Sequence, residues 1–179
     1  MNCDGQRTLQ RLHEELRRPL TGWEWLLEAV ALGGLATALG IVAASWRTLP
    51  ARIPTHFLFT GRDPDYRGDP LELLFFLGIQ VAVYALLTGS LRLPPELLNH
   101  PHPMTGEAIP RWAAAIRFVL RGTKAFLMCL QAHQVWLATA VARGHAAGSG
   151  RWVEPSLVAL PVLLITVMWL AARPHRRLR

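Results

Sequence analysis

Charge, lysine and cysteine are all scarce in this chain of 179 residues. Only 17% of the residues are charged, Lys124 is the single lysine, and the two cysteines are Cys3 and Cys129. Because one cysteine lies in a polar segment and the other in an apolar block, we expect no structural disulfide and no cysteine metal site. The chain also has no Gly-rich phosphate loop, HExxH or CxxC motif. We therefore expect a non-enzymatic protein with no catalytic residues, no cofactor and no metal.

Hydrophobic residues, in contrast, make up 51% of the chain and gather in long blocks. Four blocks, Leu26 to Ser45, Leu73 to Leu91, Ala125 to Ala142 and Pro155 to Ala172, each approach the roughly 20 residues that a helix needs to cross a bilayer. Glu28 is the only Asp, Glu, Lys or Arg within these blocks. A chain in lipid must satisfy its backbone polar groups internally. We therefore predict an all-α integral membrane protein with four transmembrane helices, at about residues 24–46, 71–91, 112–142 and 153–172.

The basic residues are divided unevenly between the two sides that these helices create. Thirteen lie near the N-terminus, in or after the loop 92–111, or after the fourth helix, and six lie in the other two loops. Positive residues accumulate on the cytoplasmic side, so we expect both termini in the cytoplasm and the loop 47–70 outside. The formal net charge of +7 would also suit a nucleic-acid-binding protein. Since the arginines follow the edges of the apolar blocks, we expect the partner to be the lipid bilayer and not nucleic acid.

Residues 1–22 form a separate cytoplasmic segment with an amphipathic pattern. Leu9, Leu12 and Leu16 share one face of a predicted helix that is otherwise charged, and Pro19 ends it. Such a helix would lie on the cytoplasmic headgroups or offer a docking surface to a protein partner. Residues 23–179 are expected to form a single transmembrane domain.

Polar residues inside the predicted spans define two more features. Glu24 and Glu28 are one helical turn apart and could pair with arginines at the start of the third helix, which would orient the bundle. In the third helix, Gln131 and Gln134 could hydrogen-bond to neighbouring helices, or could line a polar pathway together with His133.

Small residues in the first predicted helix recur at short intervals. Gly34, Ala36, Ala38 and Gly40 provide spacings that let another helix approach closely. This pattern predicts tight helix packing and no chemistry.

The loop 47–70 carries the most distinctive sequence, LPARIPTHFLFTGRDPDYRGDP from Leu49 to Pro70. Its prolines favour extended backbone, and Phe57 and Phe59 alternate with Leu58 in the pattern of a short strand. The residues from Gly61 to Pro64 indicate a turn. The loop resembles the LPxxIPxHFxxxG signature of a bacterial membrane family, the N-terminal domain of SdpI-like proteins. The loop 92–111 resembles the second motif of that family, an Asn-x-Pro-x-x-Ile/Met-Thr turn before a basic helix. The matching residues are Pro50, Ile53, Pro54, His56, Phe57, Gly61, Asn99, Pro101, Pro103 and Thr105.

The resemblance implies a multi-pass protein of the bacterial cytoplasmic (inner) membrane. The family includes immunity proteins that protect a bacterium from a secreted toxic peptide and that signal by holding a cytosolic repressor at the membrane. For this chain it implies an outer loop that senses or binds a ligand, and basic cytoplasmic helices that hold a protein partner.

Three alternatives stay open at this point. His56 with Asp63, Asp65 and Asp69 could bind a cation or ligand, or could simply cap the loop and form its turns. The chain could instead be a small accessory or structural subunit of a larger membrane complex. A small transporter or a lipid-acting enzyme would have to rest on His133 with its neighbouring glutamines and Glu28.

Overall fold

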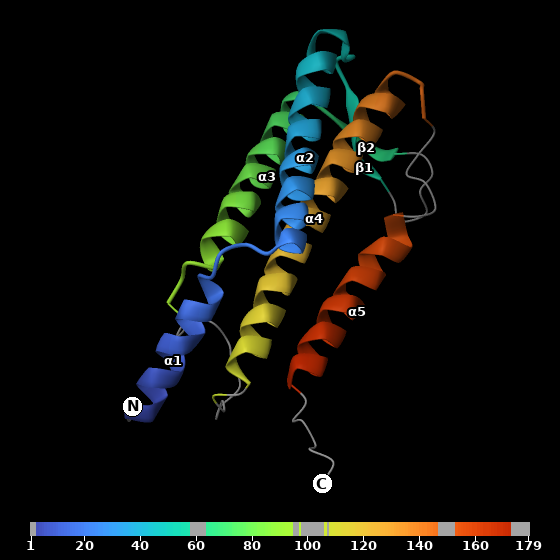
Figure 1. Cartoon of the computed structure of the whole chain (residues 1–179). Helices are drawn as coiled ribbons and strands as arrows, with labels where there is room; N and C mark the ends of the chain where they lie inside the picture. Colours follow the sequence, from blue (N-terminus) through green and yellow to red (C-terminus); the bar gives the residue numbers. More distant parts are fainter. Residues whose placement is uncertain are drawn as a thin grey trace.

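The structure is a computed structural model that describes residues 3–57, 64–94, 97, 106, 108–146 and 153–172. Helices make up most of it, and a two-stranded hairpin interrupts them once (Figure 1). In chain order the elements are α1 (Cys3–Leu16), α2 (Gly22–Ser45), the 3-10 helix η1 (Trp46–Thr48), β1 (Ile53–Phe57), β2 (Pro64–Gly68), α3 (Leu71–Ser90), α4 (Ile109–Ala142) and α5 (Val153–Ala172). The four long helices run alongside one another, with the hairpin at one end and α1 at the other (Figure 1).

Three helices are long and apolar enough to cross a membrane. They are α2 together with η1, α3, and α4. Among the residues whose side chains the structure describes, α5 contributes the shorter apolar stretch Val158–Leu170. The predicted helices 24–46, 71–91, 112–142 and 153–172 all agree with observed helices to within three residues at each end, because long apolar runs are the most readable signal in a membrane sequence.

The closest packing in the bundle is between α2 and α4. Ala31, Gly34 and Ala38 are buried in a row along α2, and a methyl group on Gly34 would lie 2.8 Å from the backbone carbonyl carbon of Met128. Glycine is therefore the residue that lets the two backbones meet. The other two small residues of the predicted pattern, Ala36 and Gly40, are exposed and take no part in this contact.

The helix α1 packs against its own chain. Leu12 and Leu16 are buried among Ile109, Ala113 and Ile116, which lie on the first turns of α4. The amphipathic helix is thus present, but its leucine face is not free for headgroups or for a partner protein. The physical reason is that α4 begins well before its apolar block and offers apolar residues at helical spacing to the same leucines.

The hairpin is the feature that an all-α prediction omits. The strands β1 and β2 are antiparallel, with Ile53 opposite Gly68 and His56 opposite Tyr66. Ile53 is fully buried in a cluster with residues of α2, α3 and α4, so it anchors the hairpin to the bundle. The strand also begins earlier than the predicted Phe57, and its partner Pro64–Gly68 has no apolar alternation that could reveal it from sequence.

Candidate functional site: a buried cluster of charges

A glutamate of α2 and an arginine of α4 form the first half of a buried charge cluster. Arg117 donates from Nε to Glu24 Oε1 at 2.6 Å and from Nη2 to Glu24 Oε2 at 2.5 Å. The same carboxylate accepts from the backbone N–H and the hydroxyl of Thr21 at 2.9 and 2.8 Å, which caps the start of α2. Both side chains are buried. Such bidentate arginine–carboxylate pairs are among the strongest charge-assisted hydrogen bonds.

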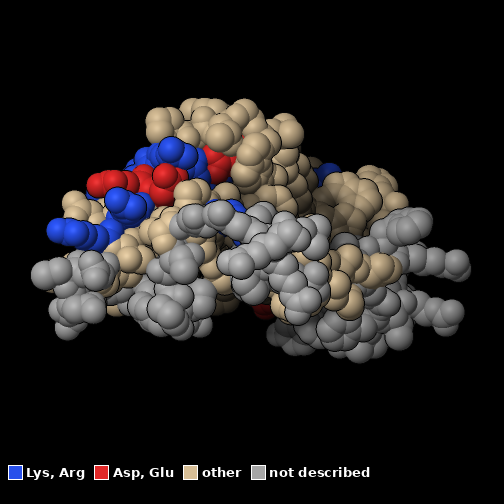
Figure 2. Space-filling view, turned by 60° about the horizontal axis from the view of Figure 1, so that its bottom comes forward, with Lys and Arg blue, Asp and Glu red and all other residues tan. Residues whose placement is uncertain are grey.

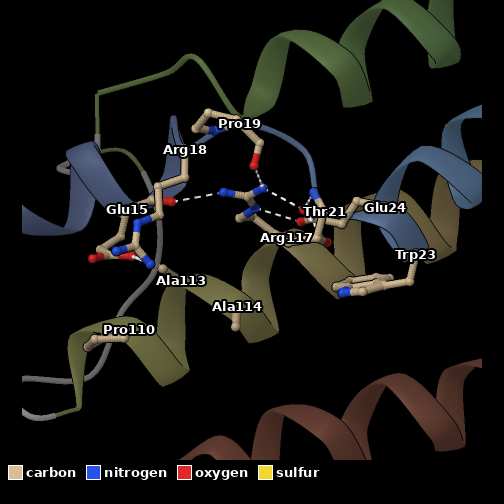
Figure 3. Close-up of a pocket in the computed structure, with 10 residues that line it drawn as sticks. All are labelled: Glu15, Arg18, Pro19, Thr21, Trp23, Glu24, Pro110, Ala113, Ala114 and Arg117. Carbon is tan, nitrogen blue, oxygen red and sulfur yellow. Dashed lines mark hydrogen bonds and ion pairs between the residues drawn. The ribbon is translucent and has the colours of Figure 1, made fainter.

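Arg117 also holds the linker that joins α1 to α2. Its Nη1 donates to the carbonyl oxygen of Glu15 at 3.1 Å, and its Nη2 donates to that of Pro19 at 3.0 Å. Figure 3 shows the guanidinium reaching from α4 across to these carbonyls, beside a cavity of about 160 Å³. One side chain therefore ties α4, the start of α2 and the end of α1 together.

A lysine and a second glutamate form the other half of the cluster. Lys124 Nζ, which is almost fully buried, donates to both carboxylate oxygens of Glu28 at 2.6 and 2.8 Å. It also donates to the hydroxyl of Thr88 at 2.9 Å and lies 4.7 Å from the centre of the Tyr84 ring, both on α3. The chain's single lysine thus connects three helices.

Arg121 lies between the two pairs. Its Nη1 is 3.4 Å from Glu24 Oε1, and its Nε is 3.4 Å from Glu28 Oε1. Both nitrogens are buried and have no hydrogen-bond partner among the described residues. With all groups ionised, three cations face two carboxylates, so the cluster carries one positive charge in excess.

The spacing of the five residues explains why they meet. Glu24 and Glu28 are four apart on α2, and Arg117, Arg121 and Lys124 are four and three apart on α4, so each set occupies one helix face. The pairing that the sequence predicted between the glutamates and the arginines is present in the structure. Burying ion pairs costs much of what their attraction supplies, so the cluster is better suited to fixing helix register than to adding stability.

The polar residues deeper in α4 do not join this cluster. Gln131, His133 and Gln134 are half-buried. The ring of His133 lies 5.6 Å from that of Trp136, and its Nε2 is buried without a hydrogen-bond partner among the described residues. Glu28 pairs with Lys124, nine residues and roughly 13 Å along the helix from His133. The set on which a transporter or enzyme would rest is therefore not brought together.

The motif residues of the predicted outer loop are only partly described. Pro50 is exposed, and Ile53 and Pro54 are buried. His56, Phe57 and Asp65 are placed by their backbone in the hairpin strands. Asp69 accepts a hydrogen bond at Oδ1 from the backbone N–H of Leu71 at 2.7 Å and so begins α3, which is the turn-forming role that the sequence left open for the aspartates. The motif residues that lie outside the described residues are Gly61, Asp63, Asn99, Pro101, Pro103 and Thr105.

A cation site at this loop was a second possibility, but the side chains of three of its four candidate ligands, His56, Asp63 and Asp65, lie outside the described residues. Within the part of the chain that the structure describes, no group of three or more His, Cys, Asp or Glu residues could hold a metal ion.

Sequence reasoning missed the contribution of α3 to the cluster. Gln80, Tyr84 and Thr88 are each four residues apart in an otherwise apolar block, a spacing that could have predicted a polar face. Gln80 donates to the carbonyl oxygen of Met128 at 3.2 Å and is buried. The α3 face therefore meets α4 through three polar side chains in a row.

Comparison of the chain with protein-family models, with curated proteins and with solved structures finds no match in any of the three.

Proposed function

We propose that the chain is a multi-pass protein of the bacterial cytoplasmic membrane in which α2, α3, α4 and α5 all span the bilayer. In this topology α1 and the end of α5 lie in the cytoplasm and the hairpin lies outside. Two observations support it. First, α1 and the end of α5 lie at the same end of the bundle, opposite the hairpin (Figure 1). Second, thirteen of the 19 basic residues belong to the segments that this topology places on the cytoplasmic side.

For this membrane protein we propose a non-enzymatic role, in which the hairpin senses or binds an external ligand and the α1 end holds a protein partner. The observation that carries the proposal is that α4 contacts both ends. It packs near its C-terminus around Ile53 of the hairpin through Val135 and Ala138, and near its N-terminus against Leu12 of α1. A packed helix transmits strain, so a displacement at the hairpin can reach α1.

The resemblance to the SdpI-like family supports an immunity or signalling role within this proposal. Ile53 and Pro54, two residues of the resembling motif, are buried and fix the hairpin on the bundle.

The charged face at the α1 end supports a partner there. Figure 2, in which this end is turned toward the viewer, shows Lys, Arg, Asp and Glu of the described residues gathered on one side. Arg7, Arg11, Glu14 and Arg17 are exposed on or just after α1. Such charges give specificity and orientation to a protein–protein contact.

The test is purification of the tagged protein from its native membranes in mild detergent, followed by mass spectrometry. We expect a soluble regulator to be recovered, and to be lost when Arg7 and Arg11 are both changed to Glu. Arg47→Glu, an exposed arginine at the hairpin end, is the matched control and should retain it. Recovery of no soluble protein, or equal recovery with all variants, would contradict a partner held by α1.

A second candidate is an accessory subunit of a larger membrane complex. Large apolar side chains are exposed along the outer faces of α3 and α5, among them Phe75, Leu86, Val158 and Ile165. These faces suit another membrane subunit as well as lipid. A stoichiometric membrane complex in the same purification would favour this candidate.

A further inference from the structure

A cavity of about 700 Å³ lies beside the buried charges at the α1 end of the bundle. It is bounded by the α1–α2 linker, α2, the end of α3 and the middle of α4. The cationic residues that line it are Arg17, Arg18, Arg92, Arg121 and Lys124. Glu28 is the one carboxylate among the described residues of its wall. The cavity is therefore strongly positive.

Three of these cations already have a carboxylate partner. Lys124 is held by Glu28 at 2.6 Å and Arg18 by Glu15 at 3.0 Å, and Arg121 lies 3.4 Å from both Glu24 and Glu28. Arg17 and Arg92 are exposed at the rim, where Arg17 Nη2 donates to the carbonyl oxygen of Arg92 at 3.3 Å. No described carboxylate lies within ion-pair distance of either rim arginine.

Arg121 has carboxylates at ion-pair distance but no hydrogen-bond acceptor at two of its nitrogens. Its side chain is only 8% exposed, and its Nε and Nη1 have no hydrogen-bond partner among the described residues. A buried donor without an acceptor loses its hydration and gains nothing in return. An anion in the cavity would supply the missing acceptor and would balance the excess positive charge.

Apolar residues also line the cavity, and some of them reach the outside of the bundle. Leu16, Leu20 and Leu91 line it together with Trp25 and Leu32 of α2. Trp25 is 62% exposed and Leu32 is 52% exposed, so both also belong to the outer surface of a helix long and apolar enough to span a membrane. A ligand in this cavity could therefore contact both cations and an apolar outer surface.

We propose that this cavity binds the phosphate group of an anionic amphiphile. The phosphate oxygens would accept hydrogen bonds from Arg121 and the rim arginines Arg17 and Arg92, and the hydrocarbon chain would lie along Trp25 and Leu32. The planar guanidinium fork matches phosphate geometry, and basic pockets between membrane helices near the cytoplasmic surface suit lipid headgroups. A soluble phosphate offers the same anion but leaves the apolar lining unused. The site is separate from the hairpin, and it shares only Arg17 with the partner contact proposed above.

The test uses the full chain, purified in a neutral detergent, and follows its thermal unfolding by tryptophan fluorescence. Phosphatidylglycerol, phosphatidylcholine with the same acyl chains, and sodium phosphate at constant ionic strength are added in separate titrations. We expect phosphatidylglycerol to raise the unfolding midpoint in a saturable way and the other two to have no comparable effect. Arg121→Gln should weaken binding and so raise the half-saturation concentration roughly tenfold to a hundredfold. Arg47→Gln, the same change on an exposed arginine at the other end, should leave it unchanged.

Arg121 belongs to a buried cluster, so a second variant guards against loss of folding. Arg92→Gln changes an exposed rim residue outside the ion pairs and should raise the half-saturation concentration of phosphatidylglycerol several-fold. Equal effects of the two lipids, or unchanged half-saturation in both Arg121→Gln and Arg92→Gln, would overturn the proposal. A shift produced equally by sodium phosphate would overturn it in favour of a soluble anion. Because purified protein and defined lipids are used, either failure leaves the partner proposal untouched.

Discussion

Gly34 of α2 faces the backbone of Met128 on α4 so closely that an added Cβ would lie 2.8 Å from the Met128 carbonyl carbon and 2.9 Å from its carbonyl oxygen. The obstacle is backbone and not the end of a flexible side chain, so it cannot rotate away. The two halves of the charge cluster lie on the same two helices, one to three turns toward α1 from this contact. The separation of α2 and α4 at Gly34 therefore sets the distance across which Glu24 and Glu28 meet their partners.

Gly34→Ala should destabilise the protein by about 1–3 kcal/mol, because the methyl group overpacks a contact that cannot relax without moving a helix. The measurement is the unfolding midpoint of the purified protein in detergent. Gly33→Ala is the matched control, since nothing lies within 4 Å of a Cβ at that position. It should be neutral or slightly stabilising, as expected for replacing glycine in a helix. Equal behaviour of the two variants would show that the close approach is absent.

Glu24→Gln should cost about 3–5 kcal/mol, because it leaves the buried guanidinium of Arg117 without a charged partner. The unfolding midpoint again provides the measurement. Glu14→Gln, which changes an exposed carboxylate on α1, should have little effect. The double variant Glu24→Gln with Arg117→Gln should recover part of the loss, since it removes the orphaned charge as well. Additive losses in the double variant would argue against direct coupling of the pair.

The sequence predicted structure where apolar or charged residues recurred at helical spacing. It did not predict contacts between residues far apart in the chain. Apolar runs located α2 to α5, and the four-residue spacing of Glu24 and Glu28 against Arg117 and Arg121 predicted their pairing. The strand Pro64–Gly68 carries no apolar alternation, so nothing local indicated it. The partner of the α1 leucines could not be predicted either, because a leucine stripe fits lipid, another protein or the same chain equally well.

Leu12→Ala should loosen α1 from α4, since Leu12 is fully buried in that contact. The cavity left by its truncation should lower the free energy of unfolding by about 2–5 kcal/mol. Trypsin cleavage after Arg17, in the exposed stretch between α1 and α2, provides a local readout. We expect faster cleavage in Leu12→Ala while the cleavage rate of Gln10→Ala, a change on the exposed face of α1, stays at that of the wild type. If lipid and not α4 holds α1, adding vesicles would slow cleavage of both variants alike.

The proposed topology predicts which ends of the molecule a reagent can reach from outside the cell. Arg52→Cys beside the hairpin and Gln10→Cys on α1 both change exposed positions, and each is made in a chain whose Cys3 and Cys129 are replaced by serine. A membrane-impermeant maleimide should label Arg52→Cys in intact spheroplasts, and Gln10→Cys only after permeabilisation, because thirteen basic residues against six favour the α1 end inside. The reverse pattern would place the arginine-lined cavity at the outer leaflet and would contradict a cytoplasmic partner for α1. Labelling of both positions from outside would be incompatible with α2 as a span, since α2 alone separates them in the chain.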